Sequence, residues 1–262
     1  MSQHIPDDLV AFAGSLADAS GGVVKRYFRT GFGIETKSDK SPVTVADREA
    51  EATIRKLIAA RYPDHGVIGE EYGADRADAE HVWILDPIDG TKSFITGRPT
   101  FGTLIALARH GRPVLGVIDH PALGHGERWI GAAGHPTLMN GKPVRTRPCP
   151  ALADAALFAS SPHYFSGDGV AGFERVRLAT RQVLYSSDCY AYGLIASGFA
   201  DILVDAKMGI YDYLACVPVV EGAGGIITDW TGKPLDIKSG DRVLAVGDPQ
   251  QHEAVMRLLA GR

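Results

Sequence analysis

The chain has 262 residues, of which 45% are hydrophobic, so it can bury a sizeable core in one large domain or two closely packed ones. Its 27 basic and 31 acidic residues give a net charge of -4, and no basic run is present that could neutralise a nucleic-acid backbone. No apolar stretch approaches the ~18 residues that a membrane span needs. We therefore expect a globular protein with neither a nucleic-acid nor a membrane partner.

The cysteines are Cys149, Cys189 and Cys216, which are far apart and lack C-x-x-C spacing. An odd number of separated cysteines argues against both a disulfide framework and a thiolate zinc site. A reducing compartment suits such a chain, and we predict a cytoplasmic protein.

The first half of the chain is predicted to form two amphipathic helices followed by a largely antiparallel sheet. Apolar residues recur at helical spacing over 8–27 and again over 44–62. Strands are expected at 66–69, 81–85, 103–107, 114–118 and 128–133. A turn is predicted directly after 81–85, because Pro87 and Gly90 do not continue a strand easily.

Strands and helices alternate in the second half, which predicts an α/β layer packed beside the first half. Strands are expected at 155–159, 182–186, 202–204 and 225–228, and helices at 172–178, 191–197 and 211–222. The junction at 148–150 is short and lacks Gly/Ser linker composition. Two rigidly packed lobes are therefore expected, residues 1–150 and 151–262.

The segment Asp86-Pro-Ile-Asp-Gly-Thr91 places two carboxylates three residues apart at the end of a strand. Both could face one cation together with the Ile88 carbonyl, and hard oxygen ligands of this kind suit Mg²⁺. Gly90 and Thr91 would offer backbone N–H groups to a phosphate at the start of a helix. Taken alone, the segment is explained equally well by a capped turn whose acids accept hydrogen bonds from nearby amides.

Further acidic positions carry similar alternatives. Glu70 and Glu71 follow a strand that ends at Gly69, where a solvated acidic turn is the ordinary interpretation. Asp212 opens an apolar helix, where an acid that interacts with the helix dipole is the ordinary interpretation. None of these segments identifies a metal site by itself.

Together the segments resemble the inositol monophosphatase family, part of the lithium-sensitive, Mg²⁺-dependent phosphatase superfamily. The matching motifs are Val43-Thr44-Val45-Ala46-Asp47, Gly69-Glu70-Glu71, Asp86-Pro-Ile-Asp-Gly-Thr91, and Tyr211-Asp212-Tyr-Leu-Ala215 followed by Glu221-Gly-Ala-Gly-Gly225. The resemblance runs from about residue 10 to about residue 235, and the combination is far more specific than any one motif. It implies an α/β (α+β) fold built as a layered α/β/α/β/α sandwich, and a homodimer.

The resemblance also implies a site for two to three Mg²⁺ ions. Glu70, Asp86 and the Ile88 carbonyl would bind one ion. Asp86, Asp89 and Asp212 would bind a second, and Glu70 would also lie near a weaker third.

The catalytic residues implied by the resemblance are Asp47 and Thr91, which would orient the attacking water and help to deprotonate it. Glu71 would support that water from behind the ligands. The water would attack phosphorus in line, so that no Ser-His or Cys-His nucleophile is needed. The histidines show no ligand spacing such as H-x-x-x-H, and we expect none of them to bind a metal.

The segments 186–193 and 97–104 resemble the histidinol-phosphate phosphatase branch of the family. Histidinol phosphate carries an ammonium and an imidazole that favour acidic partners, whereas inositol presents only hydroxyls. Asp188 and Asp205 are the candidate partners, and Tyr190 is a candidate pocket residue. As alternatives, Asp188 would cap the following helix, Asp205 would end a strand in solvent, and the tyrosine would belong to the core.

We predict a Mg²⁺-dependent phosphate monoester hydrolase, a histidinol-phosphate phosphatase of histidine biosynthesis that acts on a small molecule. The alternative within enzymes is an inositol-1-monophosphatase or a broader sugar-phosphate phosphatase. The alternative outside enzymes is a non-catalytic, phosphate-binding regulatory relative. Whether Lys37 and Arg98 touch the substrate is left open.

Overall fold

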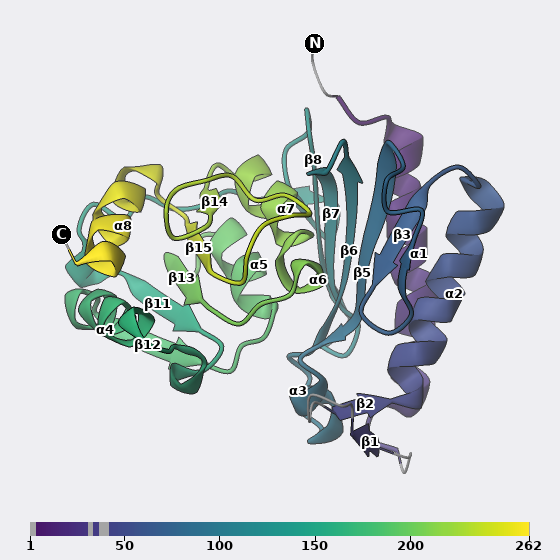
Figure 1. Ribbon diagram of the computed structural model, residues 1–262, viewed down its shortest axis with the longest axis horizontal. Helices are drawn as coiled ribbons and strands as arrows, with labels where there is room; N and C mark the ends of the chain where they lie inside the picture. Colours follow the sequence, from purple (N-terminus) through teal and green to yellow (C-terminus); the bar gives the residue numbers. More distant parts are fainter. Residues whose placement is uncertain (1–3, 31–33, 37–41, 262) are drawn as a thin grey trace.

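The computed structural model of the protein describes residues 4–30, 34–36 and 42–261, which fold into alternating layers of helix and sheet (Figure 1). The α-helices are α1 (Asp7–Tyr27), α2 (Val45–Arg61), α3 (Thr91–Ile95), α4 (Asp168–Ala179), α5 (Tyr190–Ala196), α6 (Ile210–Tyr213), α7 (Cys216–Gly222) and α8 (His252–Ala260). Short 3₁₀ turns are η1 (Leu152–Asp154), η2 (Pro162–Tyr164) and η3 (Pro249–Gln251). In the described part of the chain, no helix combines the length and apolar character that a bilayer span requires.

The larger sheet has the strand order β10-β9-β8-β7-β6-β5-β3-β4. Its strands are β3 (Gly66–Gly69), β4 (Gly73–Asp75), β5 (His81–Asp89), β6 (Gly102–Arg109), β7 (Arg112–His120), β8 (Glu127–Ala132), β9 (Leu138–Met139) and β10 (Lys142–Pro143). β3 runs parallel to β5, and the other neighbours pair antiparallel, as the sequence predicted for most of this sheet.

The smaller sheet has the strand order β12-β11-β13-β15-β14. Its strands are β11 (Ala156–Ala159), β12 (Gln182–Tyr185), β13 (Ile202–Asp205), β14 (Ile226–Thr228) and β15 (Val243–Val246). β11 pairs in parallel with β12 and β13, whereas β15 runs antiparallel to both of its neighbours. A separate antiparallel pair is formed by β1 (Ile34–Thr36) and β2 (Pro42–Thr44).

The layers follow the predicted α/β/α/β/α order (Figure 1). α1 and α2 cover one face of the larger sheet, where Leu16 and Trp83 belong to one core. α5, α6 and α7 fill the space between the two sheets, where Leu104 and Val220 belong to one core. α4 and α8 pack together on the outer face of the smaller sheet, around Phe173. Each sheet therefore buries both faces, as its mostly apolar strands require.

The predicted strand at 81–85 is longer than expected, because β5 continues to Asp89. Asp86 pairs with Leu104 and Asp89 with Gly102, so three steps along β5 match two along β6 and form a β-bulge. The interrupted ladder accommodates Pro87, which has no N–H to donate. The turn comes instead at Gly90, whose φ of 82° is left-handed.

The predicted helix at 211–222 was wrong in its continuity, since the structure has α6 and α7 instead. Leu214 and Ala215 form a turn between the two helices, and Pro218, which has no backbone N–H to give to the Leu214 carbonyl, removes one helical hydrogen bond at this point. The α6–α7 segment packs closely on β7, where a Cβ on Gly116 would lie 1.9 Å from the Ala215 carbonyl oxygen. Sequence patterns also missed β15 and α8, which lie beyond the last predicted element.

Candidate active site

A cleft of about 770 Å³ opens where the end of β5 meets α3, the start of α5 and α6. The predicted site residues that line it are Glu70, Asp86, Ile88, Asp89, Gly90, Thr91, Asp188 and Asp212. They come from both halves of the sequence, so neither sheet forms the cleft alone.

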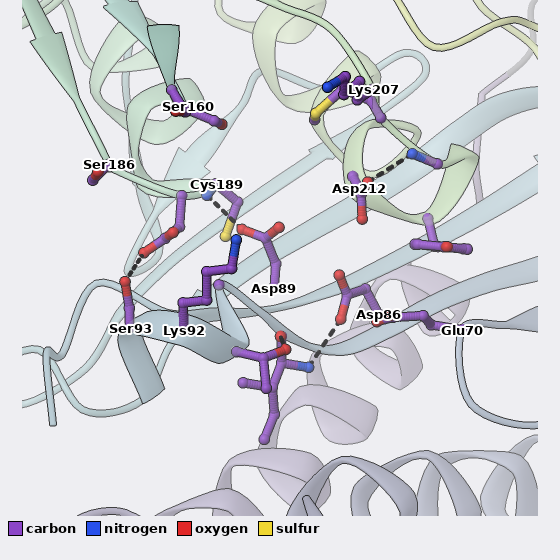
Figure 2. Close-up of a pocket in the computed structure, with 18 of the residues that line it drawn as sticks. Glu70, Asp86, Asp89, Lys92, Ser93, Ser160, Ser186, Cys189, Lys207 and Asp212 are labelled. Carbon is purple, nitrogen blue, oxygen red and sulfur yellow. Dashed lines mark hydrogen bonds between the residues drawn. The ribbon is translucent and has the colours of Figure 1, made fainter. Parts of the chain in front are cut away.

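Asp86, Asp89 and Asp212 offer carboxylate oxygens that all lie within 4.8 Å of one another. Figure 2 shows these side chains directed into the same region of the cleft, with Glu70 beside Asp86. A backbone N–H orients each of the three carboxylates. These bonds run from Ile88 to Asp86 Oδ1 (3.0 Å), from Cys189 to Asp89 Oδ2 (2.6 Å) and from Gly209 to Asp212 Oδ2 (2.7 Å).

The electrostatics of this cluster fit a cation. Burial raises the pKa of Asp86 and Asp89 well above the usual value, and repulsion by neighbouring carboxylates adds to the effect. Burial also raises the pKa of Asp212 to about 7, with the charge of Glu70 contributing. A divalent ion would relieve this repulsion. Carboxylates and the Ile88 carbonyl form a hard oxygen donor set, which suits Mg²⁺.

A second group of possible ligands lies outside the cleft at the start of α1. His4, Asp7 and His135 also have ligand atoms within 4.8 Å of one another. The two imidazole rings, however, stack 4.3 Å apart at 21°, so their in-plane nitrogen lone pairs do not converge on one ion. The oxygen cluster is therefore the stronger metal site.

Asp47 and Thr91, the predicted water-activating pair, approach the cluster from different elements. Asp47 is buried in the first turn of α2, where the Thr44 backbone N–H donates to its Oδ2 at 2.8 Å. Burial raises the pKa of Asp47 to about 6, and the nearby charge of Glu70 adds to the shift. The Thr91 hydroxyl donates to the Ile88 carbonyl at 3.2 Å and lines the cleft, whereas Asp47 lies behind the lining.

Sequence analysis missed Glu51, a fully buried residue of α2 that holds the Glu70–Glu71 turn. Its carboxylate accepts hydrogen bonds from the backbone N–H groups of Glu71 (2.8 Å) and Tyr72 (3.2 Å). The approach is so close that a Cβ on Gly69 would lie 2.0 Å from Glu51 Oε1. Glu51 follows Asp47 by four residues on the same helix face, and this spacing could have identified it. Glu71 itself lies outside the cleft lining.

The convergence of these motifs on one cleft agrees with comparison to known proteins. The model of the inositol monophosphatase family matches residues 6–261. This chain belongs to the inositol monophosphatase family. The family resemblance inferred from the sequence motifs is thereby confirmed, and the chain is a phosphatase of that family.

The relatives of this chain are named for different phosphatase activities. The chain is 48% identical to the bifunctional phosphatase IMPL2, chloroplastic, of Arabidopsis thaliana, over 97% of this chain and 75% of that protein. It is 38% identical to a histidinol-phosphatase of Chlorobaculum parvum, over 83% and 84% of the two chains. An inositol monophosphatase structure from Zymomonas mobilis superposes with a TM-score of 0.89 at 44% identity, covering 97% and 98% of the two chains. Family membership thus leaves the substrate open.

Asp188 lines the cleft of this inositol monophosphatase family member as predicted. Its Oδ2 accepts hydrogen bonds from the hydroxyls of Ser93 (2.6 Å) and Thr100 (2.9 Å). The backbone at Gly90 leaves room for this carboxylate, because a Cβ there would lie 2.5 Å from Asp188 Cγ. The alternative that Asp188 caps α5 is wrong, since Cys189 occupies the N-cap position.

Asp205 and Tyr190, both predicted to contact substrate, lie outside the cleft lining. Asp205 is buried at the end of β13 rather than in solvent, and its two oxygens accept from the backbone N–H (2.9 Å) and hydroxyl (2.7 Å) of Ser160. Ser160 lines the cleft in its place. The Tyr190 hydroxyl donates to Glu127 at 3.0 Å, and its ring packs against Trp129. A contact at the end of the neighbouring strand β11 therefore holds Asp205, and a contact with β8 in the larger sheet holds Tyr190, so that neither side chain lines the cleft.

Cationic side chains also line the cleft, and sequence analysis had named Lys37 and Arg98 as possible substrate contacts. Lys37 lies outside the described residues, and Arg98 lines the cleft and donates to the Ser186 carbonyl at 2.6 Å. Lys92 and Lys207 line the cleft as well, with their Nζ atoms 5.8 and 6.0 Å from the centre of the Tyr164 ring. Lys92 directly follows the Asp86–Thr91 motif, which could have identified it, whereas no motif marks Lys207 and only the fold brings it to this cleft.

Proposed function

We propose that this phosphatase hydrolyses L-histidinol phosphate to L-histidinol and phosphate, as a step of histidine biosynthesis. The observation that carries the proposal is the Asp188 carboxylate, which lines the cleft near the cluster of Asp86, Asp89 and Asp212 without belonging to it. A substrate with an ammonium group gains from such a carboxylate, whereas a polyol does not need its charge. Histidinol-phosphatases of Chlorobaculum parvum and Mycobacterium tuberculosis, 38% and 33% identical to the chain, support the proposal.

The family is Mg²⁺-dependent, and we propose that two to three ions bind this cleft. Glu70, Asp86, Asp89, Asp212 and the Ile88 carbonyl would hold them. When bound, Mg²⁺ supplies Lewis-acid stabilisation of the charge on the phosphate oxygens. The protein holds the ligands in place before the ions bind, through the three backbone hydrogen bonds to the carboxylates.

Asp47 and Thr91 are proposed to handle the proton of the attacking water. Asp47 lies behind the cleft lining, so we propose that it acts through the Thr91 hydroxyl, which lines the cleft. A pKa of about 6 suits a base that works near neutral pH. Lys92 and Lys207 would attract the phosphate group of the substrate, since both line the same cleft.

Inositol 1-phosphate is the second candidate substrate. Ser160, Ser161 and Tyr164 line the cleft, and their hydroxyls suit a polyol. The solved inositol monophosphatase of Zymomonas mobilis, at 44% identity, is among the relatives that favour this alternative.

The experiment that tests the proposal compares Mg²⁺-dependent phosphate release from L-histidinol phosphate, inositol 1-phosphate and a hexose phosphate, with EDTA as the control. We expect the highest kcat/KM for L-histidinol phosphate and no turnover in EDTA. A higher kcat/KM for inositol 1-phosphate would overturn the substrate assignment and leave the metal chemistry standing. Turnover that persists in EDTA would overturn the metal chemistry.

The proposal includes the cytoplasmic homodimer expected from the sequence. Sedimentation equilibrium of the Mg²⁺-loaded protein at micromolar concentration tests the dimer. A mass that stays at one chain, 27.9 kDa, would contradict it.

A further inference from the structure

Tyr192 is a residue of α5 that lines the cleft yet is almost completely buried, with 1% of its surface exposed. Its hydroxyl is buried and has no hydrogen-bond partner among the described residues. Burying a hydroxyl without a partner opposes folding, so native proteins rarely do so without a reason. The position of this hydroxyl against the cleft suggests where a partner would come from.

Other tyrosines between the two sheets are satisfied by protein groups. The Tyr213 hydroxyl, also fully buried, donates to the carbonyl oxygens of Gly240 (2.9 Å) and Ser239 (3.3 Å). The Tyr190 hydroxyl donates to Glu127. The fold is therefore able to pair phenol groups in this layer, and Tyr192 differs because it lines the cleft with a buried hydroxyl that the described residues leave unpaired.

The charges around Tyr192 keep its hydroxyl a donor. Burial, together with the charges of Cys216, Asp205 and the carboxylate cluster, raises the pKa of this phenol well above 10. Asp205 is already engaged, because its two oxygens accept from Ser160. Asp89 and Asp212 each have one oxygen held by a backbone N–H and face the proposed metal site. Tyr192 lines the same cleft as these carboxylates, so its unpaired donor borders a region that a ligand would occupy.

We infer that the Tyr192 hydroxyl donates a hydrogen bond to an oxygen that is not part of the protein and that binds in the cleft. Two sources supply such an oxygen, the phosphate group itself and a water held at the carboxylate cluster when Mg²⁺ is present. The inference rests on the proposed function only in requiring that the cleft binds Mg²⁺ and phosphate. Tyr192 would position that oxygen, and a phenylalanine would keep the shape of the cleft wall without the donor.

The test uses Tyr192→Phe in the full chain and compares melting temperatures in EDTA, in Mg²⁺, and in Mg²⁺ with inorganic phosphate. In EDTA the variant should melt at the wild-type temperature or up to about 4 °C higher, because it no longer buries an unpaired hydroxyl. At a fixed concentration, a ligand that binds the folded state raises the melting temperature more the more tightly it binds, so the variant should gain less than wild type. Tyr213→Phe is the matched control and should melt lower in EDTA, since its hydroxyl has protein partners.

The arms of the experiment identify the source of the oxygen. A smaller gain with Mg²⁺ alone assigns the partner to a water at the metal site, and a smaller gain only after phosphate is added assigns it to the phosphate. Equal ligand-induced gains in variant and wild type would overturn the inference. A lower melting temperature of Tyr192→Phe in EDTA would also overturn it, because the hydroxyl would then have a protein partner.

Turnover adds an independent measurement that does not depend on the substrate assignment. With p-nitrophenyl phosphate and saturating Mg²⁺, we expect Tyr192→Phe to lower kcat/KM by about tenfold or more, the loss expected when a charged acceptor loses its donor. Hydrolysis of any phosphate monoester gives inorganic phosphate as a product. The binding arms therefore remain informative if L-histidinol phosphate proves not to be the substrate.

Discussion

The backbone N–H of Cys189 donates a hydrogen bond to Oδ2 of Asp89 at 2.6 Å, across a separation of 100 residues in the sequence. This bond joins the end of β5 in the larger sheet to the start of α5, the helix that leads into the smaller sheet. The carboxylate cluster is consequently oriented by both halves of the chain. A substitution that keeps this hydrogen bond but removes the charge should therefore show separately how the charge affects metal binding and how it affects folding.

Asp89→Asn keeps an oxygen that can accept the Cys189 hydrogen bond but removes a charged ligand. We expect Mg²⁺-dependent phosphate release to fall by more than about 100-fold, beyond the loss typical of residues that only support a metal ligand. The melting temperature in EDTA should not fall, because the neutral amide relieves repulsion with Asp188 and Asp212. Phosphate release over a Mg²⁺ titration, with a thermal melt in EDTA, measures both effects. Wild-type turnover in this variant would contradict the metal assignment and favour a metal-independent site.

Glu51→Gln should weaken Mg²⁺ binding although Glu51 lies outside the cleft lining. The substitution removes the charge that accepts from the Glu71 and Tyr72 amides and pairs with Arg55 at 2.7 Å. Loosening the turn that carries Glu70 should raise the Mg²⁺ concentration for half-maximal activity by about tenfold and lower the melting temperature. Glu49→Gln, on the same helix but paired with Arg26 at the surface, is the matched control and should leave the Mg²⁺ requirement unchanged. Equal Mg²⁺ requirements in both variants would contradict the positioning role of Glu51.

Asp188→Asn tests how the cleft selects its substrate. The amide can still pair with the Ser93 and Thr100 hydroxyls, so the local fold should persist. Loss of the charge should lower kcat/KM for L-histidinol phosphate by roughly 10-fold or more, given about 1.5–3 kcal/mol for a hydrogen bond to a charged group. The effect on inositol 1-phosphate should be much smaller, because that substrate has no cation. Equal losses of kcat/KM for both substrates would show that Asp188 does not recognise the ammonium group.

The buried carboxyl of Asp205 should make stability depend on pH. Burial raises its pKa from 3.8 to about 7, so between these values the folded state holds a proton that the unfolded state has released. The stability contribution of Asp205 is therefore fully kept below about pH 4 and declines as the pH rises toward 7, by ~4 kcal/mol at most. Asp205→Asn should remove this decline, so that the variant melts higher than wild type at pH 8 and nearly the same at pH 4. Chemical denaturation of both proteins at pH 4 and pH 8 measures the free energy of unfolding. An equal decline in wild type and variant would contradict this role of Asp205.

Particular residues show how far sequence reasoning reached. The spacing of Asp86 and Asp89 on one segment predicted that both carboxylates face the same region, and the cleft contains both. The strands of the antiparallel meander were predicted because their apolar patterns are local. The turn after 81–85 was misplaced, since the β-bulge that admits Pro87 depends on pairing with β6 rather than on β5 alone. The break between α6 and α7 was missed although Pro218 marks it in the sequence, because a proline cannot donate a helical hydrogen bond.

The sequence by itself determined the family, the layered fold and the carboxylates that line the cleft, because motifs and periodicities are encoded within a few residues of one another. The tertiary structure alone decided which side chains of the second half face that cleft. Asp205 turns toward Ser160, 45 residues away, and Tyr190 toward Glu127, 63 residues away. Tyr192 lines the cleft instead with its hydroxyl unpaired by the described residues. Such orientations follow from pairing between strands and packing between layers, and short sequence patterns carry no information about which distant element a side chain will meet.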